Sequence, residues 1–221
     1  MSHVLKIGVT AAIAALVLSA TATADKEKIR YTAAGQTDAR AAVIKKTDLG
    51  TTVTWTGGPT EPDLSNTQFA ACAYKPRESD LTTIGAAEAD WKTAGLELDS
   101  ETTVLQTPTM VARDWQRTVT APQVLPCLRA SLQKVVKPSE HILSLHSVSF
   151  PRLTQYTRKF RLIMSVKAGT GKTTKLMFDF IAIGQGQTEL SLTTISPYVT
   201  RAAVNTAEIR LSENLISRIR A

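Results

Sequence analysis

Residues 160–195, FRLIMSVKAGTGKTTKLMFDFIAIGQGQTELSLTTI, contain three alternating apolar patterns separated by two Gly-x-Gly motifs. In the first pattern, Phe160, Leu162 and Met164 occupy every second position, the period expected of a strand with one face on a core. The alternation recurs at Leu176, Phe178 and Phe180 and at Leu190 and Leu192. The stretch therefore predicts a meander of three antiparallel strands.

The two Gly-x-Gly motifs, 169–171 and 184–186, predict three-residue hairpin loops, because glycine adopts a positive φ at little steric cost. The resulting registers place apolar residues opposite each other: Phe160 with Phe180, Leu162 with Phe178, Met164 with Leu176, Phe180 with Leu190 and Phe178 with Leu192. All three strands then share one apolar face, and a slip of one residue would turn that face over.

Two features of this stretch allow a chemical interpretation. The run GTGKTT at 169–174 resembles the end of a phosphate-binding loop, but the glycine expected five residues before Gly171 is Val166, and a strand follows instead of a helix. We interpret it as a hairpin turn. Asp179 is a lone carboxylate among apolar residues, where a catalytic acid can lie; the register places it opposite Arg161, which favours a structural ion pair.

The N-terminal residues 1–24 have the pattern of a secretory signal: a basic start at Lys6, an apolar run over 7–18 and the sequence Ala-Thr-Ala before Asp25. The apolar run is too short to span a bilayer, and no cysteine follows it that could carry a lipid anchor. We expect cleavage after Ala24, a flexible lead over 25–36 and a single domain over 37–221, secreted or extracytoplasmic and without a transmembrane anchor.

The chain has two cysteines, Cys72 and Cys127. In an oxidising compartment two cysteines are most simply paired, so we predict a disulfide between them. A thiol nucleophile is the alternative.

The other segments predict further elements by their periodicity and end signals. Thr37 and Asp38 are candidate caps for a helix over 39–46, and Thr107-Pro108 opens another helix. The expected strands are 51–56, 81–91, 96–106 and 141–150, and two further helices are expected from Pro122 and from Pro197 to about Arg220. The segment 69–74 fits either a helical turn or a short strand. The sum is an α+β fold: an antiparallel sheet of five to seven strands, with three or four helices packed mainly on one face and one disulfide.

This order of elements resembles actinobacterial secreted domains that are similar to mycobacterial envelope lipoproteins and to the extracellular sensor domains of serine/threonine kinases. The likeness is carried by Asp48-Leu49-Gly50 with Trp55, by the two cysteines, and by the Gly-x-Gly meander followed by the C-terminal helix. The resemblance implies an antiparallel sheet with flanking helices and, for some members, ligand binding in a cleft. It carries over no binding residue, and the chain lacks the family's second cysteine pair.

Catalytic residues do not stand out in the sequence, and we predict no catalytic site, no metal site and no cofactor. His141 and His146 are five residues apart and would point to opposite faces of a strand, which does not make a shared metal site. A Ser-His-Asp arrangement stays open because such triads assemble in space, although no G-x-S-x-G elbow is present.

The formal net charge of +7 suits anionic envelope polymers or lipid headgroups. The candidate contacts lie on the two middle helices: Arg113, Arg117, Arg129 and Lys134. Nucleic acid is a poor candidate partner, since aromatics make up only 5% of the residues. We therefore predict a non-catalytic binding or sensor-like module for a hydrophobic or anionic cell-envelope ligand. The alternatives are a secreted hydrolase acting on envelope esters or glycans, and a structural partner of another secreted protein.

Overall fold

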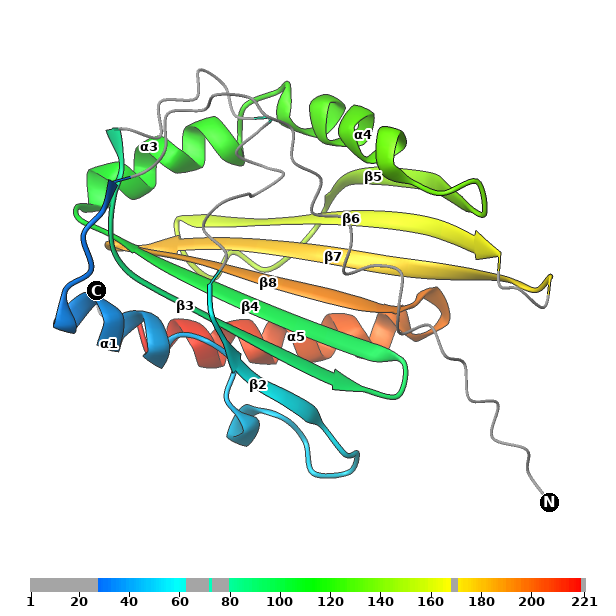
Figure 1. The fold of residues 1–221 in the computed structure, drawn as a ribbon, viewed down its shortest axis with the longest axis horizontal. Coiled ribbons are helices and arrows are strands. Elements are labelled where there is room, and N and C mark those ends of the chain that lie inside the picture. Colours follow the sequence, from blue (N-terminus) through cyan, green and yellow to red (C-terminus); the bar gives the residue numbers. More distant parts are fainter. Residues whose placement is uncertain (1–27, 63–71, 73–79, 168–170, 220–221) are drawn as a thin grey trace.

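The computed structural model describes residues 28–62, 72, 80–167 and 171–219. The predicted signal peptide, most of the segment 69–74 and the tip of the first Gly-x-Gly loop lie outside these residues. The strands of the one sheet are β1 Lys28–Ile29, β2 Thr56–Thr60, β3 Thr82–Thr93, β4 Leu96–Leu105, β5 Glu140–Val148, β6 Tyr156–Lys167, β7 Thr173–Gln185 and β8 Thr188–Pro197. Their order is β1-β3-β4-β8-β7-β6-β5, with β2 also paired to β3 (Figure 1).

Four α-helices are described: α1 Ala33–Ala41, α3 Pro108–Thr118, α4 Val124–Val135 and α5 Arg201–Ile216. Two 3-10 turns, η1 Lys46–Asp48 and η3 Tyr198–Thr200, follow α1 and precede α5. The α+β class and the single disulfide are confirmed, and the eight strands exceed the five to seven expected. All neighbouring strands are antiparallel except β1 and β3, which are parallel.

The register of the β6–β7 hairpin is the predicted one. Phe160 pairs with Phe180, Leu162 with Phe178 and Met164 with Leu176. The phosphate-loop-like run is thus part of a hairpin, with Lys167 paired to Thr173.

The predicted register of the second hairpin is wrong by three residues. Phe180 pairs with Thr193 and Phe178 with Ile195, because the loop has two residues, Gly186 and Gln187, with φ +57° at Gly186. Gly184 lies within β7, where an added Cβ would come within 3.0 Å of Val111. Leu190 and Leu192 consequently face the opposite side of the sheet from Phe178.

Helices cover both faces of the sheet, which corrects the expectation that they pack mainly on one face. α1 and α5 pack against Ile181, Ile183 and Leu192, whereas α4 packs against Leu162, Met164 and Phe178 on the other side (Figure 1). α3 lies on the α4 side, where its residue Val111 packs against Leu81 and Leu105 at the far end of the sheet. Both sets of alternating residues in β7 are apolar, so each set requires its own cover.

The predicted helix over 39–46 is wrong in position, because α1 begins six residues earlier. Thr32 caps it by accepting a hydrogen bond from the Gly35 backbone N–H at 3.0 Å. Gly35 meets Gly85 of β3 so closely that a Cβ on Gly85 would lie 2.1 Å from the Gly35 carbonyl oxygen. This contact packs α1 against β3, with which β1 also pairs.

The strand predicted over 51–56 is also misplaced, since β2 covers Thr56–Thr60 and includes Gly57, Gly58 and Pro59. Pro59 is tolerated because β2 is an edge strand, where a missing N–H costs no ladder hydrogen bond. Gly57 has φ +122°, and a Cβ there would lie 2.0 Å from the Asp90 carbonyl oxygen. Only glycine fits this position.

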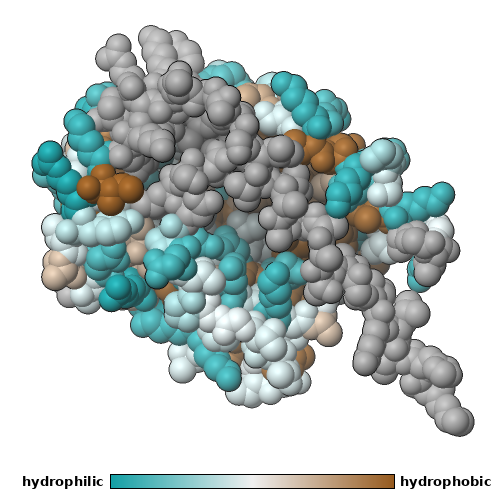
Figure 2. All heavy atoms as spheres, in the orientation of Figure 1, coloured by the Kyte–Doolittle hydropathy of each residue, from teal (hydrophilic) through white to brown (hydrophobic). Residues whose placement is uncertain are grey.

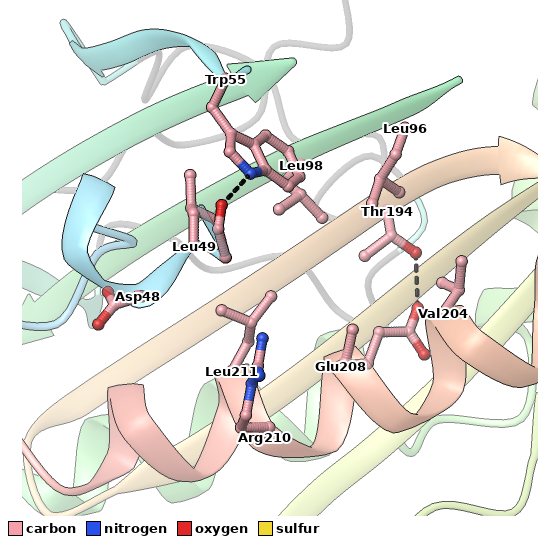
Figure 3. A pocket seen from close by; sticks show the side chains of 12 residues that line it. Asp48, Leu49, Trp55, Leu96, Leu98, Thr194, Val204, Glu208, Arg210 and Leu211 are labelled. Carbon is pink, nitrogen blue, oxygen red and sulfur yellow. Dashed lines mark hydrogen bonds between the residues drawn. The ribbon is translucent and has the colours of Figure 1, made fainter. Parts of the chain in front are cut away.

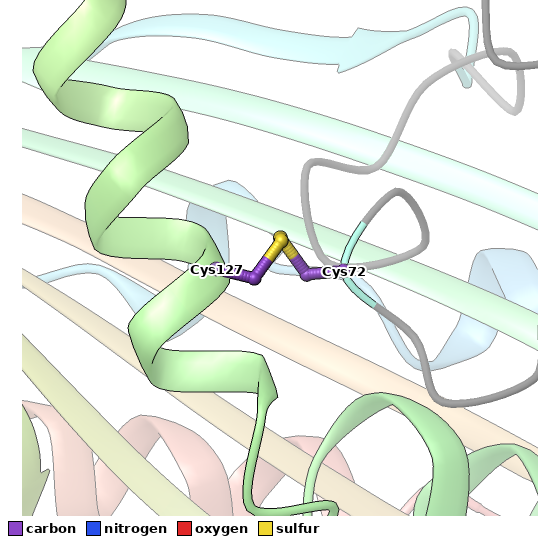
Figure 4. Close-up of a disulfide and its surroundings, with 2 residues drawn as sticks. All are labelled: Cys72 and Cys127. Atoms are coloured by element: carbon purple, nitrogen blue, oxygen red, sulfur yellow. A yellow bond between two sulfur atoms is a disulfide. The ribbon is translucent and has the colours of Figure 1, made fainter.

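The Cys72–Cys127 disulfide is present, with the two Cα atoms 5.6 Å apart (Figure 4). It ties α4 to the segment that contains Cys72, and Cys72 itself is buried against Leu128, Leu162 and Phe178. The thiol nucleophile considered from the sequence is thereby excluded.

Candidate functional site

Charged residues of opposite sign collect at two separate places on the sheet. We call the first the lysine end: Lys134, Lys137, Lys167, Lys172 and Lys175, where α4, β6 and β7 come together. The second is the acidic face, made of Glu88 and Asp90 of β3 with Asp99 and Glu101 of β4.

The lysine end is brought together by strand pairing and one loop contact. Lys175 pairs with Ser165, which pairs on its other side with His141, and Lys167 pairs with Thr173 beside Lys172. The Lys167 backbone N–H donates to the Ser139 carbonyl at 2.8 Å, which fixes the loop between α4 and β5 against β6. In Figure 2 the end of the molecule where α4 and this hairpin lie shows hydrophilic residues beside hydrophobic ones.

All five lysines are exposed. Among the described residues, no carboxylate lies within ion-pair distance of the amines of Lys134, Lys167, Lys172 or Lys175. The acidic residue next to them, Glu140, accepts a hydrogen bond from the Lys137 backbone N–H at 3.2 Å. The lysine end therefore carries an excess of positive charge that is available to an anionic partner.

The acidic face places like charges directly opposite each other: Glu88 pairs with Glu101, and Asp90 pairs with Asp99. Carboxylate oxygens of Glu88, Asp90 and Asp99 all lie within 4.8 Å of one another. The pKa of Asp99 is raised to about 8, mainly by burial. The hydrogen bond with Asp90 and repulsion from the neighbouring carboxylates raise this pKa further. The carboxyl of Asp99 is thus protonated more readily than an ordinary aspartate.

The geometry of the acidic face limits its chemistry. Three carboxylates form the oxygen-only donor set that Ca²⁺ or Mg²⁺ prefers, and this cluster was not identified from the sequence, where no metal site was predicted. For glycoside hydrolysis the carboxyl groups must stand about 5–10 Å apart to admit the sugar and water. Asp90 and Asp99 share a hydrogen bond and are too close for that arrangement.

A buried ion network lies between α5 and the sheet. Lys159, 2% exposed, contacts Asp179 at 2.8 Å and also the carboxylate of Glu208. Arg161 donates to both carboxylate oxygens of Asp179 at 2.6 Å, and Asn205 of α5 accepts from Lys159 at 2.9 Å.

Two pKa values in this network move in opposite directions. Burial opposes ionisation of Asp179, but the hydrogen bonds from Arg161 and Lys159 outweigh it and hold the pKa of Asp179 below its usual range. Burial and then repulsion from Asp179 raise the pKa of Glu208 to about 7, against the opposing effect of Lys159 and Thr194. Every charged group in the network has a partner within it, and Asn205 and Glu208 of α5 are among these partners. The network therefore holds α5 on the sheet.

A small pocket lies next to the network (Figure 3). It has about 40 Å³ and is lined by Leu49, Trp55, Leu98, Val204 and Leu211, with Glu208 at one side. Sites for small molecules are typically about 300–1,000 Å³, so this pocket is too small for a lipid chain. The Trp55 indole N–H donates to the Gly50 carbonyl at 3.1 Å, and this bond accounts for the sequence feature Asp48-Leu49-Gly50 with Trp55.

The four basic residues proposed from the sequence do not form one surface. Arg113 and Arg117 of α3 lie 3.8 and 3.3 Å from the same carboxylate oxygen of Asp80. Arg129 and Lys134 are exposed on α4, and Lys134 belongs to the lysine end.

The two histidines point to the same face of the sheet, which corrects the expectation of opposite faces. His141 pairs with Ser165 and His146 with Arg161, because a β-bulge at Leu143 shifts the alternation by one residue. Four β6 residues separate the two positions, about 13 Å along the strand, so they share no metal site. Neither histidine has a hydrogen bond to a described serine.

Sequence reasoning missed Lys159, Glu208 and both acid pairs of the acidic face. Lys159 and Glu208 are charged residues at positions that look solvated when each segment is examined alone. The acid pairs follow from the β3–β4 register, in which Thr93 pairs with Leu96. The strands expected over 81–91 and 96–106 would instead pair Trp91 with Leu96 and place Asp90 opposite Glu97, so the sequence did not give the observed pairs.

The fold and these sites define an α+β domain whose sheet is covered by helices on both faces and which carries a lysine-rich end. No protein-family model matches the sequence, and no curated protein matches it. An uncharacterized protein of Mycobacterium smegmatis, an Rv0999 ortholog, is similar in structure at 13% identity and a TM-score of 0.47, over 83% of this chain and 97% of that one.

The extracellular domain of the kinase PknH from Mycobacterium tuberculosis is also similar, at 7% identity and a TM-score of 0.43, over 82% of this chain and 96% of that one. The solved structures that are similar to this chain thus include an extracellular domain of a mycobacterial kinase, one of the kinds of protein named in the sequence resemblance. No helix among the described residues is long and apolar enough to cross a membrane.

Proposed function

We propose that this domain is a non-catalytic extracytoplasmic module that binds an anionic, phosphate-bearing or carboxylate-bearing partner of the cell envelope through its lysine end. The observation that carries the proposal is the set of exposed lysines from α4, β6 and β7, four of which have no ion pair to a described residue. The predicted signal peptide and the disulfide support the extracytoplasmic location.

The charge of the lysine end supports an anionic partner more directly than the pockets support a hydrophobic one. The apolar pocket beside α5 has about 40 Å³ and no room for an acyl chain, and the larger pocket of about 330 Å³, lined by residues 153–156 and 184–186, has Thr154, Gln155 and Gln185 in its wall. The lysine end is open to a large charged surface. Positive charge also speeds encounter with an anionic surface, and this attraction weakens as salt screens it.

The proposal is tested by binding of the secreted protein to the sedimented cell envelope of its host. The variant with Lys172→Glu and Lys175→Glu removes the positive charge at the hairpin, and we expect it to remain in the supernatant. The matched control is the variant with Arg30→Glu and Arg40→Glu, exposed cations outside the lysine end, which we expect to bind like the unchanged protein.

Circular dichroism of both variants checks that each is folded. Equal loss of binding in the two variants would mean that only net charge matters, and undiminished binding of the lysine variant would refute a role for the lysine end. Binding of the unchanged protein that does not weaken with salt would also contradict the proposal.

A further inference from the structure

The lysine end carries an exposed apolar residue at its margin. Val199 lies in η3 and is 85% exposed, more than any other large hydrophobic residue among the described ones. It follows Pro197 by two residues, and Pro197 pairs with Leu176, the neighbour of Lys175. Val199 therefore lies beside the lysines of β7.

The residues around Val199 have the chemistry of a membrane interface. The Arg201 guanidinium stacks over the Tyr198 ring at 4.9 Å from its centroid. Tyrosine is enriched where a protein meets the headgroup region of a bilayer, and arginine pairs with the phosphates there. This group adds another cation and an aromatic ring next to the exposed valine.

A second exposed apolar residue lies on the other side of the lysines. Leu143 is 46% exposed at the β-bulge of β5. Its neighbour Ile142 pairs with Met164, Met164 pairs with Leu176, and Leu176 pairs with Pro197, so one row of paired residues connects Leu143 to η3. Three strand spacings separate the ends of this row, about 15 Å.

We propose that the lysine end docks on an anionic lipid bilayer, with Val199 and Leu143 entering the headgroup region while the lysines contact lipid phosphates. This inference rests on the proposed function and names its partner. A soluble anionic polymer would satisfy the lysines equally well but would gain nothing from the two apolar side chains. A bilayer gains from both, because burial of apolar surface adds to electrostatic attraction.

The test compares vesicles of equimolar phosphatidylglycerol and phosphatidylcholine with vesicles of phosphatidylcholine alone and with soluble polyphosphate. The secreted protein should bind the mixed vesicles and show little binding to the neutral ones. The substitution Val199→Asp should weaken binding to the mixed vesicles about tenfold, since it removes a buried valine side chain and adds a repelled charge. Its binding to polyphosphate should change much less.

The matched control is Ile29→Asp, which adds the same charge at an exposed apolar residue at the opposite end of the sheet. It should leave vesicle binding within about twofold of that of the unchanged protein, since a charge so far from the surface is screened. The double variant with Lys172→Glu and Lys175→Glu should bind the mixed vesicles about 30-fold more weakly, or worse. Each lysine near an anionic surface contributes about fivefold to the affinity.

The outcomes separate the two proposals. The bilayer inference is overturned, and the proposed function is retained, if two results occur together. Binding to polyphosphate depends on the lysines and is unchanged by Val199→Asp, and Val199→Asp and Ile29→Asp have equal effects on binding to vesicles. Absence of binding to both anionic probes would overturn both.

Discussion

Replacing Lys159 by methionine tests the most heavily charged part of the core. Lys159 lies between two carboxylates, Asp179 at 2.8 Å and Glu208, with exposed fractions of 2%, 0% and 1% for the three side chains. Asp179 keeps both hydrogen bonds from Arg161 after the substitution. Glu208 keeps only the 2.6 Å hydrogen bond from Thr194.

The cost therefore falls on Glu208, which loses its cation in a buried position. Removing one partner of a buried ion pair typically costs about 3–5 kcal/mol, and we expect about 3 kcal/mol at pH 8 because Asp179 remains paired. The double variant with Lys159→Met and Glu208→Gln should recover most of this loss, since the amide keeps a hydrogen bond with Thr194 and carries no charge.

The cost depends on pH with a definite sign. The folded-state pKa of Glu208 is already raised to about 7, and loss of Lys159 raises this pKa further. The folded state then binds more protons than the unfolded state, so stability falls as pH rises from the unfolded pKa of about 4.5 through the folded pKa. Urea unfolding of the single variant should show a smaller loss at pH 5.5 than at pH 8.

Free energies of unfolding, measured for the single and the double variant, test whether Lys159 and Glu208 form a coupled pair. A loss below about 1 kcal/mol at pH 8, or a double variant no more stable than the single one, would refute the assignment of Lys159 and Glu208 as a coupled pair.

Three further predictions concern stability. Replacing Cys72 and Cys127 by serine should lower the free energy of unfolding by about 4 kcal/mol, as loop entropy gives for a separation of 55 residues, and urea titration checks it. Asp99→Asn should stabilise the protein by roughly 2 kcal/mol at pH 8.5 and by less near pH 5. The folded-state pKa of Asp99, about 8, lies above its unfolded-state pKa, so the unsubstituted protein loses stability as pH rises above the unfolded-state pKa. Equal gains at both pH values would contradict the raised pKa. Gly85→Ala should cost about 3 kcal/mol by thermal unfolding, since its Cβ would lie 2.1 Å from a backbone oxygen, whereas Gly58→Ala meets nothing within 4 Å and should cost less than about 0.5 kcal/mol.

The sequence predicts the central hairpin because alternation and loop length agree on one register. Phe160, Leu162 and Met164 fix the face, and the register then gives the pairing of Arg161 with Asp179. The second hairpin fails because Gly184 resembles a loop residue, although the reason for glycine there is crowding by Val111, a contact between distant segments. Local sequence does not contain that contact.

The position of α1 is hidden for a similar reason. Thr32 and Gly35 are weak helix signals on their own, and the close approach of Gly35 to Gly85 becomes visible only in the folded chain. Thr37 and Asp38 look like caps by residue type but lie inside the helix. The bulge at Leu143 is equally unmarked in the sequence, and it reverses the side to which His146 points.

The candidate site is predicted in part. Net positive charge points to an anionic partner, and Lys134 is the one member of the lysine end identified from the sequence. The sequence-based choice of Arg113 and Arg117 cannot anticipate that both lie against Asp80, because this carboxylate comes from another segment. Lys167, Lys172 and Lys175 belong to a strand hairpin, and the contact of Lys167 with Ser139 in the loop after α4 forms only on folding.

Amine-reactive footprinting of the protein tests the central claim most directly. The protein is acetylated free and in the presence of vesicles of equimolar phosphatidylglycerol and phosphatidylcholine, and the extent of modification at each lysine is measured by mass spectrometry. We predict protection of Lys167, Lys172 and Lys175, with no change at the exposed lysines Lys45 and Lys46 of the η1 region. Equal protection of all these lysines, or protection of Lys45 and Lys46 alone, would contradict the account.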